Sequence, residues 1–251
     1  MFIDTHCHLS VKDYDNIDAI IKENLDNGVK KIIISVCEYD DFAEGIALIS
    51  KYNCAYMTIG FHPSEADSID DDKMKKLEEI LSSIEKVVGV GEIGLDYHYD
   101  DINKRKQKEL FEKQLLLAEK YNLPVVIHTR DATEDTIEIL KKHNNRGVIH
   151  CFSGSYETAK IYLNLGYKIG IGGVVTFKNS KLPDTLKKLA IDNIVLETDS
   201  PYLCPEPFRG KKNSSKYIPV IASRIAEIYG IEVGLVEKIT TDNACKVFDL
   251  Y

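Results

Sequence analysis

The sequence predicts an α/β fold in which eight parallel strands close into a (β/α)8 barrel, the TIM-barrel architecture. Three observations predict it. Short runs of β-branched residues alternate with longer segments whose apolar residues recur at helical spacing. These runs number eight, which is the strand count of the barrel. The length of 251 residues suits one such barrel, so we expect residues 1–251 to form a single domain.

The eight predicted strands are short and rich in valine and isoleucine, residues that favour extended structure. In chain order they are Phe2–His6, Lys31–Val36, Ala55–Ile59, Val87–Gly91, Val125–His128, Gly147–His150, Lys168–Ile171 and Ile194–Glu197. The alternative is a doubly wound open sheet, which more often carries a glycine-rich phosphate loop after its first strand. Here the first strand runs into His6-Cys7-His8, which is no such loop.

The segments between the strands have the periodicity of helices. Ile17, Ile20, Ile21 and Leu25 form one apolar stripe, and Leu110–Ala118 contains another. Further helices are predicted at Thr133–Lys142, Tyr156–Leu165, Leu182–Leu189, Ile218–Tyr229 and Val233–Phe248. Gly28 and Gly166 follow their helices, at the position where glycine commonly ends a helix.

Composition and charge narrow the class of protein. The formal net charge of −8 disfavours a protein whose whole surface attracts nucleic acid, although it leaves room for a local basic site. No apolar run approaches the roughly 20 residues that a membrane span needs, and the first residues lack the pattern of a signal peptide. The six cysteines are scattered without CxxC spacing, which is typical of reduced thiols. We therefore expect a cytoplasmic protein with no membrane partner.

Titratable side chains gather where the predicted strands end, which is the end of a TIM barrel that carries catalytic groups. Two carboxylates are there, because the fourth strand runs into Glu92 and the eighth into Asp199. Scattered histidines would not be expected to follow the strand ends, yet five of the seven do. They are His6, His8, His62, His128 and His150. The sequence therefore predicts a polar site at one end of the barrel.

His6 and His8 are separated by one residue, so on a strand both imidazoles point the same way and can face one ion. Imidazole is a good ligand for zinc and similar metals. By itself the pair could equally be two partly buried histidines. The other polar groups at the strand ends favour a metal, because one buried rim would otherwise hold too many polar atoms without partners.

Six candidate ligands are more than one tetrahedral site needs, and two ions that share a carboxylate would use them all. We expect one divalent ion on His6, His8 and Asp199 and a second on His128 and His150. Glu92 is placed to bridge them, because its strand lies between the strands of the two histidine groups. Two such ions, for example Mg²⁺, Mn²⁺ or Zn²⁺, stabilise the attacking and leaving oxygens of a hydrolysis. Asp199 and Glu92 are the candidate catalytic residues, with Asp199 accepting the proton of the attacking water.

Candidate substrate contacts follow the third and fifth strands. His62 would contact the substrate from the third strand, or else it caps the turn before Pro63. Arg130 would bind an anionic oxygen, or else it forms a structural salt bridge.

The loop that follows Asp199 is the third candidate. It is stiffened by three prolines and carries Tyr202, Arg209 and Lys211. Its cations would hold a phosphate beside the metals, or else it is a solvated basic loop.

The motifs at the strand ends occur together, in order, through nearly the whole chain. They are Asp4–Leu9, Gly60–Pro63, Gly89–Tyr97, Pro124–Arg130, His150–Gly154, Glu197–Leu203, Arg209–Lys211 and Asn213. This set closely resembles the TatD-type metal-dependent hydrolases, the TatD DNase family of the amidohydrolase superfamily.

The resemblance implies a TIM barrel that is usually a monomer and holds one to three divalent metals. It implies that Glu92 bridges and that the remaining ligands are His6, His8, His128, His150 and Asp199. Members of the family are deoxyribonucleases, often with 3′-exonuclease action on single strands. One departure is visible: members often continue Asn-Glu-Pro after the Arg-Gly-Lys stretch, whereas this chain has Asn213-Ser214-Ser215. That glutamate therefore has no counterpart in this stretch of the chain.

Phosphodiester hydrolysis on DNA is the leading hypothesis, because two metals suit a dianionic transition state better than that of a neutral amide. A recessed barrel mouth would favour chain ends and unpaired strands. The second hypothesis is a hydrolase of a small amide, ester or lactone, and the third is a metal-binding protein without catalysis. The complete ligand set disfavours the third. No obligate protein partner is predicted.

Overall fold

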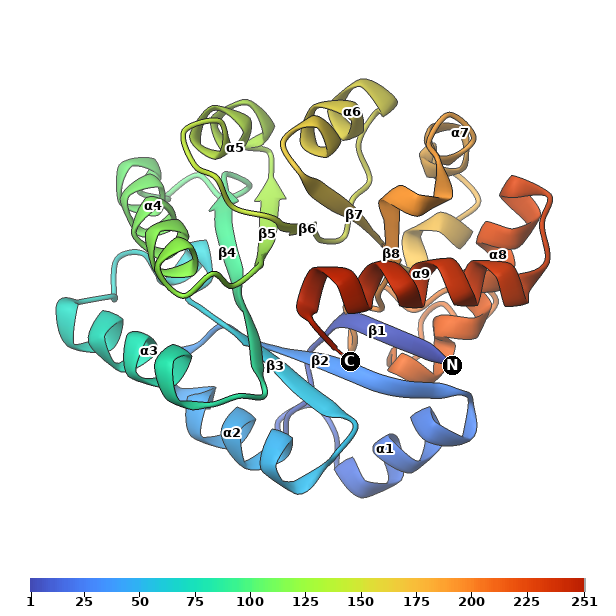
Figure 1. Ribbon diagram of the computed structural model, residues 1–251, viewed down its shortest axis with the longest axis horizontal. Coiled ribbons are helices and arrows are strands. Elements are labelled where there is room, and N and C mark those ends of the chain that lie inside the picture. The colour runs from blue at the N-terminus through green and yellow to red at the C-terminus, as the bar shows by residue number, and fades with distance from the viewer. Residues whose placement is uncertain (251) are drawn as a thin grey trace.

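The computed structural model describes residues 1–250, in which eight parallel strands lie side by side in the order β1 to β8 (Figure 1). The strands are β1 (Phe2–Cys7), β2 (Val29–Val36), β3 (Ala55–Ile59), β4 (Val87–Asp96), β5 (Val125–Arg130), β6 (Gly147–Ile149), β7 (Tyr167–Ile171) and β8 (Ile194–Leu196). Each strand pairs with the next, so the predicted (β/α)8 barrel is confirmed.

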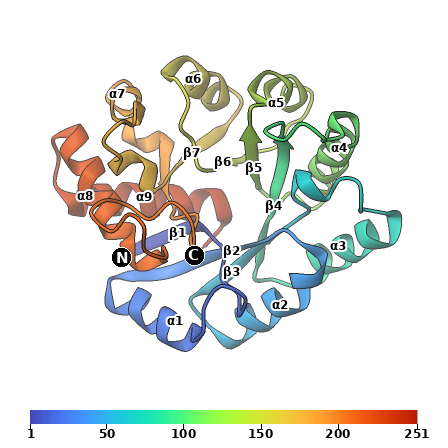
Figure 2. The same ribbon diagram turned by 180° about the vertical axis from the view of Figure 1, so that it is seen from behind.

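Helices surround the strands on the outside (Figures 1 and 2). They are α1 (Ile17–Asp26), α2 (Phe42–Lys51), α3 (Asp71–Ser83), α4 (Lys104–Lys120), α5 (Thr133–Leu140), α6 (Tyr156–Asn164), α7 (Leu182–Leu186), α8 (Ile218–Tyr229) and α9 (Val233–Phe248). Short 3₁₀ turns lie at Tyr39–Asp41, Pro63–Glu65, Gly173–Thr176, Ile191–Asn193 and Ser215–Tyr217. Within residues 1–250, none of the helices has the length and apolar character that a membrane crossing requires.

The inside of the barrel is filled by one residue from each of several strands. The inner cluster contains Ile3, Ile33, Val88, Val126, Val148 and Val195. Their sequence neighbours, such as Ile32 and Ile34 beside Ile33, pack instead in the outer cluster beneath the helices, as alternation along a strand requires. Helix α9 completes the inner cluster with Ala244, Val247 and Phe248, so it covers the end of the barrel where the strands begin. The opposite end is left for the site.

The first and last strands, β1 and β8, are joined at that opposite end by backbone hydrogen bonds between residues at the end of β1 and the segment that follows β8. The amide of Asp199 donates to the carbonyl of His6 over 3.0 Å, and the amide of His8 donates to the carbonyl of Ser200 over 2.7 Å. These bonds lie beyond the last residue of β8. The barrel is therefore closed by the same segments that carry three of the predicted metal ligands.

An extra residue in β1 turns its histidines inward. Asp4 pairs with Ile32 and Cys7 with Ile34, so three steps on β1 match two on β2. Such a bulge reverses the alternation of side chains. Ile3 accordingly packs inside the barrel, whereas Cys7 lies in the outer cluster and its thiol donates to the carbonyl of Ile33. His6 and His8, on either side of Cys7, face the barrel interior.

Strand β4 is longer than predicted and has a similar irregularity. The sequence predicts that it ends at Gly91, but it continues to Asp96, because Ile93–Asp96 pair with Ile127–Arg130 of β5. Three steps from Val90 to Ile93 match two on β5. Val90 and Ile93 both pack in the outer cluster, which leaves Glu92 directed inward.

Candidate metal centre

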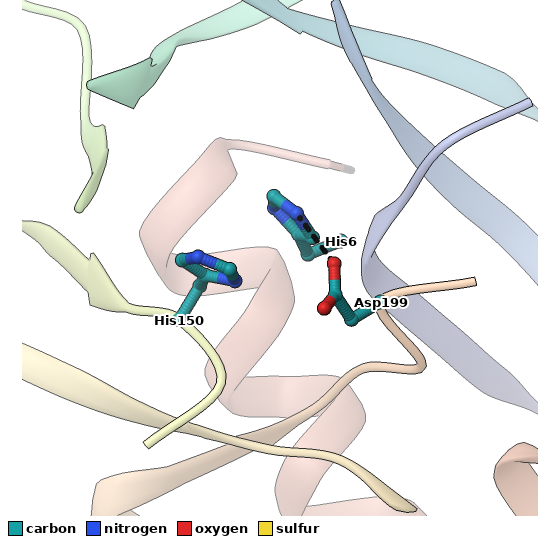
Figure 3. Close-up of side chains that lie close together, drawn as sticks. All are labelled: His6, His150 and Asp199. Carbon is teal, nitrogen blue, oxygen red and sulfur yellow. Dashed lines mark ion pairs between the residues drawn. The ribbon is translucent and has the colours of Figure 1, made fainter. Parts of the chain in front are cut away.

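A pocket opens at the carboxyl ends of the strands, and all the predicted ligands except buried His6 line it. Those in the lining are His8, Glu92, His128, His150 and Asp199. His6 is only 1% exposed and lies beneath, with its ring stacked 4.2 Å from that of His150 (Figure 3). The structure thus brings together six side chains from five separate parts of the sequence.

The first half of the centre joins β1 to the segment after β8. His6 Nε2 lies 3.4 Å from Asp199 Oδ1 and 3.5 Å from Glu92 Oε2. His8 Nε2 lies 3.5 Å and 3.7 Å from the same two oxygens. Ligands placed tetrahedrally at about 2.1 Å from an ion are about 3.4 Å from one another. These four atoms are therefore spaced as the ligands of one metal ion.

The ring nitrogens support that interpretation. His8 Nδ1 lies 3.2 Å from the carbonyl oxygen of Ser35, which accepts its proton and leaves Nε2 with a free lone pair. Neither ring nitrogen of His6 has a hydrogen-bond partner, although both are buried. A buried polar atom without a partner is costly, so a cation among these atoms would satisfy a need that the protein leaves open.

The second half of the centre is built on the other oxygen of Glu92. Oε1 lies 2.7 Å from His128 Nδ1 and 2.8 Å from His150 Nε2. Glu92 Oε2 faces His6 and His8, so the two oxygens of one carboxylate face two different pairs of histidines. This is the arrangement that a carboxylate bridging two ions requires.

Asp96 is a residue of the site that the sequence analysis did not single out. Its Oδ2 lies 3.1 Å from His128 Nε2, the nitrogen on the far side of the ring from Glu92. A carboxylate in that position fixes the tautomer and orientation of a metal-binding histidine. Its ligand atoms also form a group with those of His62 and His128 that could hold a cation. The available signal was its position four residues after Glu92, which places both on one face of a strand.

Two further buried carboxyl groups support the ligands from below. Asp4 accepts hydrogen bonds from the amide of His6 and from the amide and hydroxyl of Thr198, which ties β1 to the segment after β8. Glu197 accepts a hydrogen bond from the amide of Cys151, next to His150. Burial raises the pKa of Glu197 to about 8. Both groups act on the backbone that carries the ligands.

The electrostatics of the centre favour positive charge. Burial alone would raise the pKa of Glu92, but the neighbouring His150 and His128 hold it well below its usual range. Burial likewise opposes a charge on His6, yet the nearby carboxylates of Asp199 and Glu92 raise its pKa well above the usual value. Against the same effect of burial, the neighbouring carboxylates raise the pKa of His128 to about 9. Two ionised carboxylates at this depth attract a proton or a metal ion.

The predicted substrate contacts divide into two groups. His62, Arg130 and Tyr202 line the pocket. His62 also caps the turn at Pro63–Glu65, since its Nδ1 accepts from the amide of Ser64. Burial lowers the pKa of His62 to about 4, so it is a neutral group.

Arg209 and Lys211 are not among the described residues that line the pocket. The guanidinium of Arg209 packs 4.4 Å from the centre of the Phe177 ring, and Lys211 lies over Phe208. The departure at Asn213-Ser214-Ser215, in contrast to the exposed Arg209 and Lys211, is buried. Asn213 donates to the carbonyls of Thr198 and Tyr202, so it holds the loop after Asp199 in place.

Known proteins similar to this chain include metal-dependent hydrolases. The model of the family described as "TatD related DNase" matches residues 3–249. The uncharacterized metal-dependent hydrolase YabD of Bacillus subtilis is 39% identical over 253 residues, which cover 99% of each chain.

This chain belongs to the TatD-related DNase family.

Solved structures of other TatD proteins have the same fold. The crystal structure of YjjV, a TatD homologue from Escherichia coli, aligns with a TM-score of 0.93 at 33% identity and covers 100% of this chain and 98% of YjjV. A hydrolase of the TatD family from Entamoeba histolytica aligns with a TM-score of 0.89 at 26% identity, covering 98% and 97%. This TatD-related protein is therefore a metal-dependent hydrolase.

Proposed function

We propose that this TatD-related hydrolase is a divalent-metal-dependent deoxyribonuclease that cleaves phosphodiester bonds near the ends of single strands. The observation that carries the proposal is the position of the Glu92 carboxylate, whose two oxygens face separate pairs of histidines. Two cations side by side suit the doubly charged transition state of phosphodiester hydrolysis better than that of a neutral amide.

The ligands divide between two ions, such as Mg²⁺, Mn²⁺ or Zn²⁺. One set consists of His6, His8, Glu92 and Asp199, and the other of Glu92, His128 and His150. When bound, ions of this kind lower the pKa of water to about 7 and offset the charge of a phosphate. Asp96 orients His128 by accepting the proton of its Nε2.

Hydrolysis adds water across one P–O ester bond. The water oxygen bonds to phosphorus, the bond to one nucleoside oxygen breaks, and that oxygen takes up a proton. Asp199 is the proposed acceptor of the proton that water loses, through Oδ2, because its Oδ1 faces His6 and His8. Arg130 binds a phosphate oxygen of the substrate, and His62 contacts the substrate as a neutral imidazole.

One observation favours a second function, the hydrolysis of small molecules. Besides the predicted ligands and Asp96, the pocket lining contains four carboxylates. They are Asp13, Glu38, Asp41 and Glu44. Such a wall repels a long polyanion and would tolerate a small neutral ester, lactone or amide. A hydrolase of small molecules is therefore the alternative.

The test uses labelled single-stranded and double-stranded DNA with Mg²⁺ or Mn²⁺. We expect the intact protein to shorten the single strand, and EDTA or Glu92→Ala to abolish cleavage. Glu85→Ala is the matched control, because Glu85 is exposed and lies just before the opposite end of β4. Cleavage that survives both EDTA and Glu92→Ala would overturn the metal-nuclease proposal. Intact DNA alongside turnover of esters or lactones would replace it with the alternative.

A further inference from the structure

Two exposed tyrosines face the pocket from opposite sides. Tyr99 follows β4 and is 59% exposed, and Tyr202 follows β8 and is 60% exposed. Both line the same pocket. In an eight-stranded barrel, the fourth and eighth strands lie across from each other (Figure 1). An exposed aromatic ring is a stacking surface for an unpaired base, so the pocket has such a surface on either side of the metal centre.

The Tyr99 side carries a free cation. Only one lysine and one arginine, Lys12 and Arg130, are among the described residues of the lining. Lys12 is held by Asp41 and lies 3.9 Å from Glu38. Arg130 forms no ion pair within residues 1–250, and its guanidinium lies 5.8 Å from the centre of the Tyr99 ring. Arg130 and Tyr99 together therefore present a phosphate ligand next to a base-stacking ring.

The Tyr202 side is acidic. Asp13, Glu38, Asp41 and Glu44 come from the segments after β1 and β2, and Lys12 offsets only one of these four charges. The Tyr202 ring lies 6.2 Å from the ring of His8, on this same side. Asp100 and Asp101 also follow Tyr99 and line neighbouring hollows that Tyr99 shares, but neither is in the lining of this pocket. One side thus accepts a phosphate and the other accepts a base but repels a second phosphate.

We propose that the pocket holds a single strand in one direction, with the continuing chain over Tyr99 and Arg130 and the terminal nucleoside on Tyr202. This inference rests on the proposed deoxyribonuclease function and adds the residues that select a chain end. A strand that continued on both sides of the cut would place a phosphate against the carboxylates near Tyr202. The acidic wall is therefore the element that excludes internal positions.

The stacking half of the inference is tested by the steady-state kinetics of single-strand cleavage. Tyr99→Ala and Tyr202→Ala should each raise KM about tenfold while kcat changes much less, because a base–aromatic stack is lost. Tyr99→Phe and Tyr202→Phe keep the ring and should restore KM. Tyr39→Ala is the control: Tyr39 is also exposed on this end of the barrel but lies outside the pocket lining, and it should leave KM unchanged.

The wall is tested with circular single-stranded DNA, which has no end. Wild type should degrade the linear form and spare the circle, and Glu38→Gln combined with Glu44→Gln should raise circle cleavage relative to linear at least tenfold. If wild type cleaves linear DNA, either of two results would overturn this inference alone. One is an unchanged KM in both alanine variants, and the other is an unchanged ratio of circle to linear cleavage in the double variant. No cleavage of any DNA by wild type would overturn the proposed function and this inference with it.

Discussion

Glu92 determines the geometry of the centre at the scale of single residues. Its two oxygens face different histidines, and the imidazole nitrogens of His6, His8, His128 and His150 lie 2.7–3.7 Å from the nearest oxygens of Glu92. Asp96 then fixes one histidine from behind, so the centre depends on a residue that would not itself touch the bridged ions.

Asp96→Ala should weaken the binding of the second metal equivalent by roughly 10- to 100-fold, because His128 loses the acceptor that orients its ring. Isothermal titration with Mn²⁺ measures the effect. The control is Asp131→Asn, which alters a second histidine–aspartate pair, His98 with Asp131, at the same 3.1 Å distance but away from the ligands. Equal affinities in Asp96→Ala and wild type would show that Asp96 does not orient a ligand.

At this scale the structure brings the six predicted ligands together, and the sequence could single them out because histidines and carboxylates at strand ends are chemically conspicuous. Asp96 was missed because the predicted fourth strand stopped at Gly91, which placed Asp96 in a loop. Tyr99 and Arg130 could not be paired from the sequence either, since their contact depends on how the loop after β4 folds against the end of β5.

Strand β4 is the element on which the centre depends most. Its bulge directs Glu92 inward, and its later residues pair with those of β5 that carry His128. Gly94 lies directly opposite His128 with a positive φ of 144°, and a Cβ atom there would lie 2.0 Å from the carbonyl oxygen of His128. The close approach of β4 and β5 that brings His128 to Glu92 therefore requires glycine.

Gly94→Ala should lower the free energy of unfolding by about 3 kcal/mol or more, because the new methyl group meets rigid backbone and the conformation is strained. Urea unfolding measures the change. Gly234→Ala is the matched control in helix α9, where an added Cβ meets nothing within 4 Å, and it should change stability by no more than about 1 kcal/mol. Equal effects of the two substitutions would refute the close-approach argument.

The elements also show the limits of prediction from sequence. Ala55–Ile59 was predicted with its observed bounds, because its apolar run stands between polar segments. The predicted fourth strand was too short because the glycines of β4 interrupt the alternation of apolar side chains that indicates a strand. Helix α2 contains Gly45, whose added Cβ would lie 2.7 Å from Met57 and Val36, so its sequence reflects close packing on the sheet more than helical propensity.

The whole molecule assembles the centre from segments distant in sequence. The predicted ligands come from β1, β4 and β5 and from the segments after β1, β6 and β8. The backbone hydrogen bonds from Asp199 to His6 and from His8 to Ser200 close the barrel at the same place. The ligands converge only in the closed barrel, so metal binding and folding should be coupled.

Saturating Mn²⁺ should raise the midpoint of thermal unfolding by about 5 °C or more relative to the protein in EDTA, because an ion that binds only the folded state adds about 3 kcal/mol at a hundredfold excess over Kd. Differential scanning calorimetry measures the shift. Glu85→Ala should keep it and Glu92→Ala should lose most of it. Identical midpoints in Mn²⁺ and EDTA would contradict the coupling.

The fold and the hydrolase class could be reached from the sequence because both follow from patterns that run along the entire chain. The DNA substrate could not, because it depends on the charge and shape of a pocket built from separate loops. The basic loop after Asp199 illustrates the difference: its sequence suggested phosphate binding, yet Arg209 packs on Phe177. Of the lysine and arginine side chains described in the pocket lining, Arg130 is the one without an ion pair in residues 1–250.

The central claim is that one carboxylate, Glu92, bridges two ions, and electron paramagnetic resonance of the Mn²⁺-loaded protein tests it most directly. Two ions about 3.5–4 Å apart that share a carboxylate are magnetically coupled. We predict that two equivalents bind and give a coupled spectrum, and that Glu92→Ala gives only uncoupled Mn²⁺. A single uncoupled equivalent in wild type, or a coupled pair that persists in Glu92→Ala, would contradict the account.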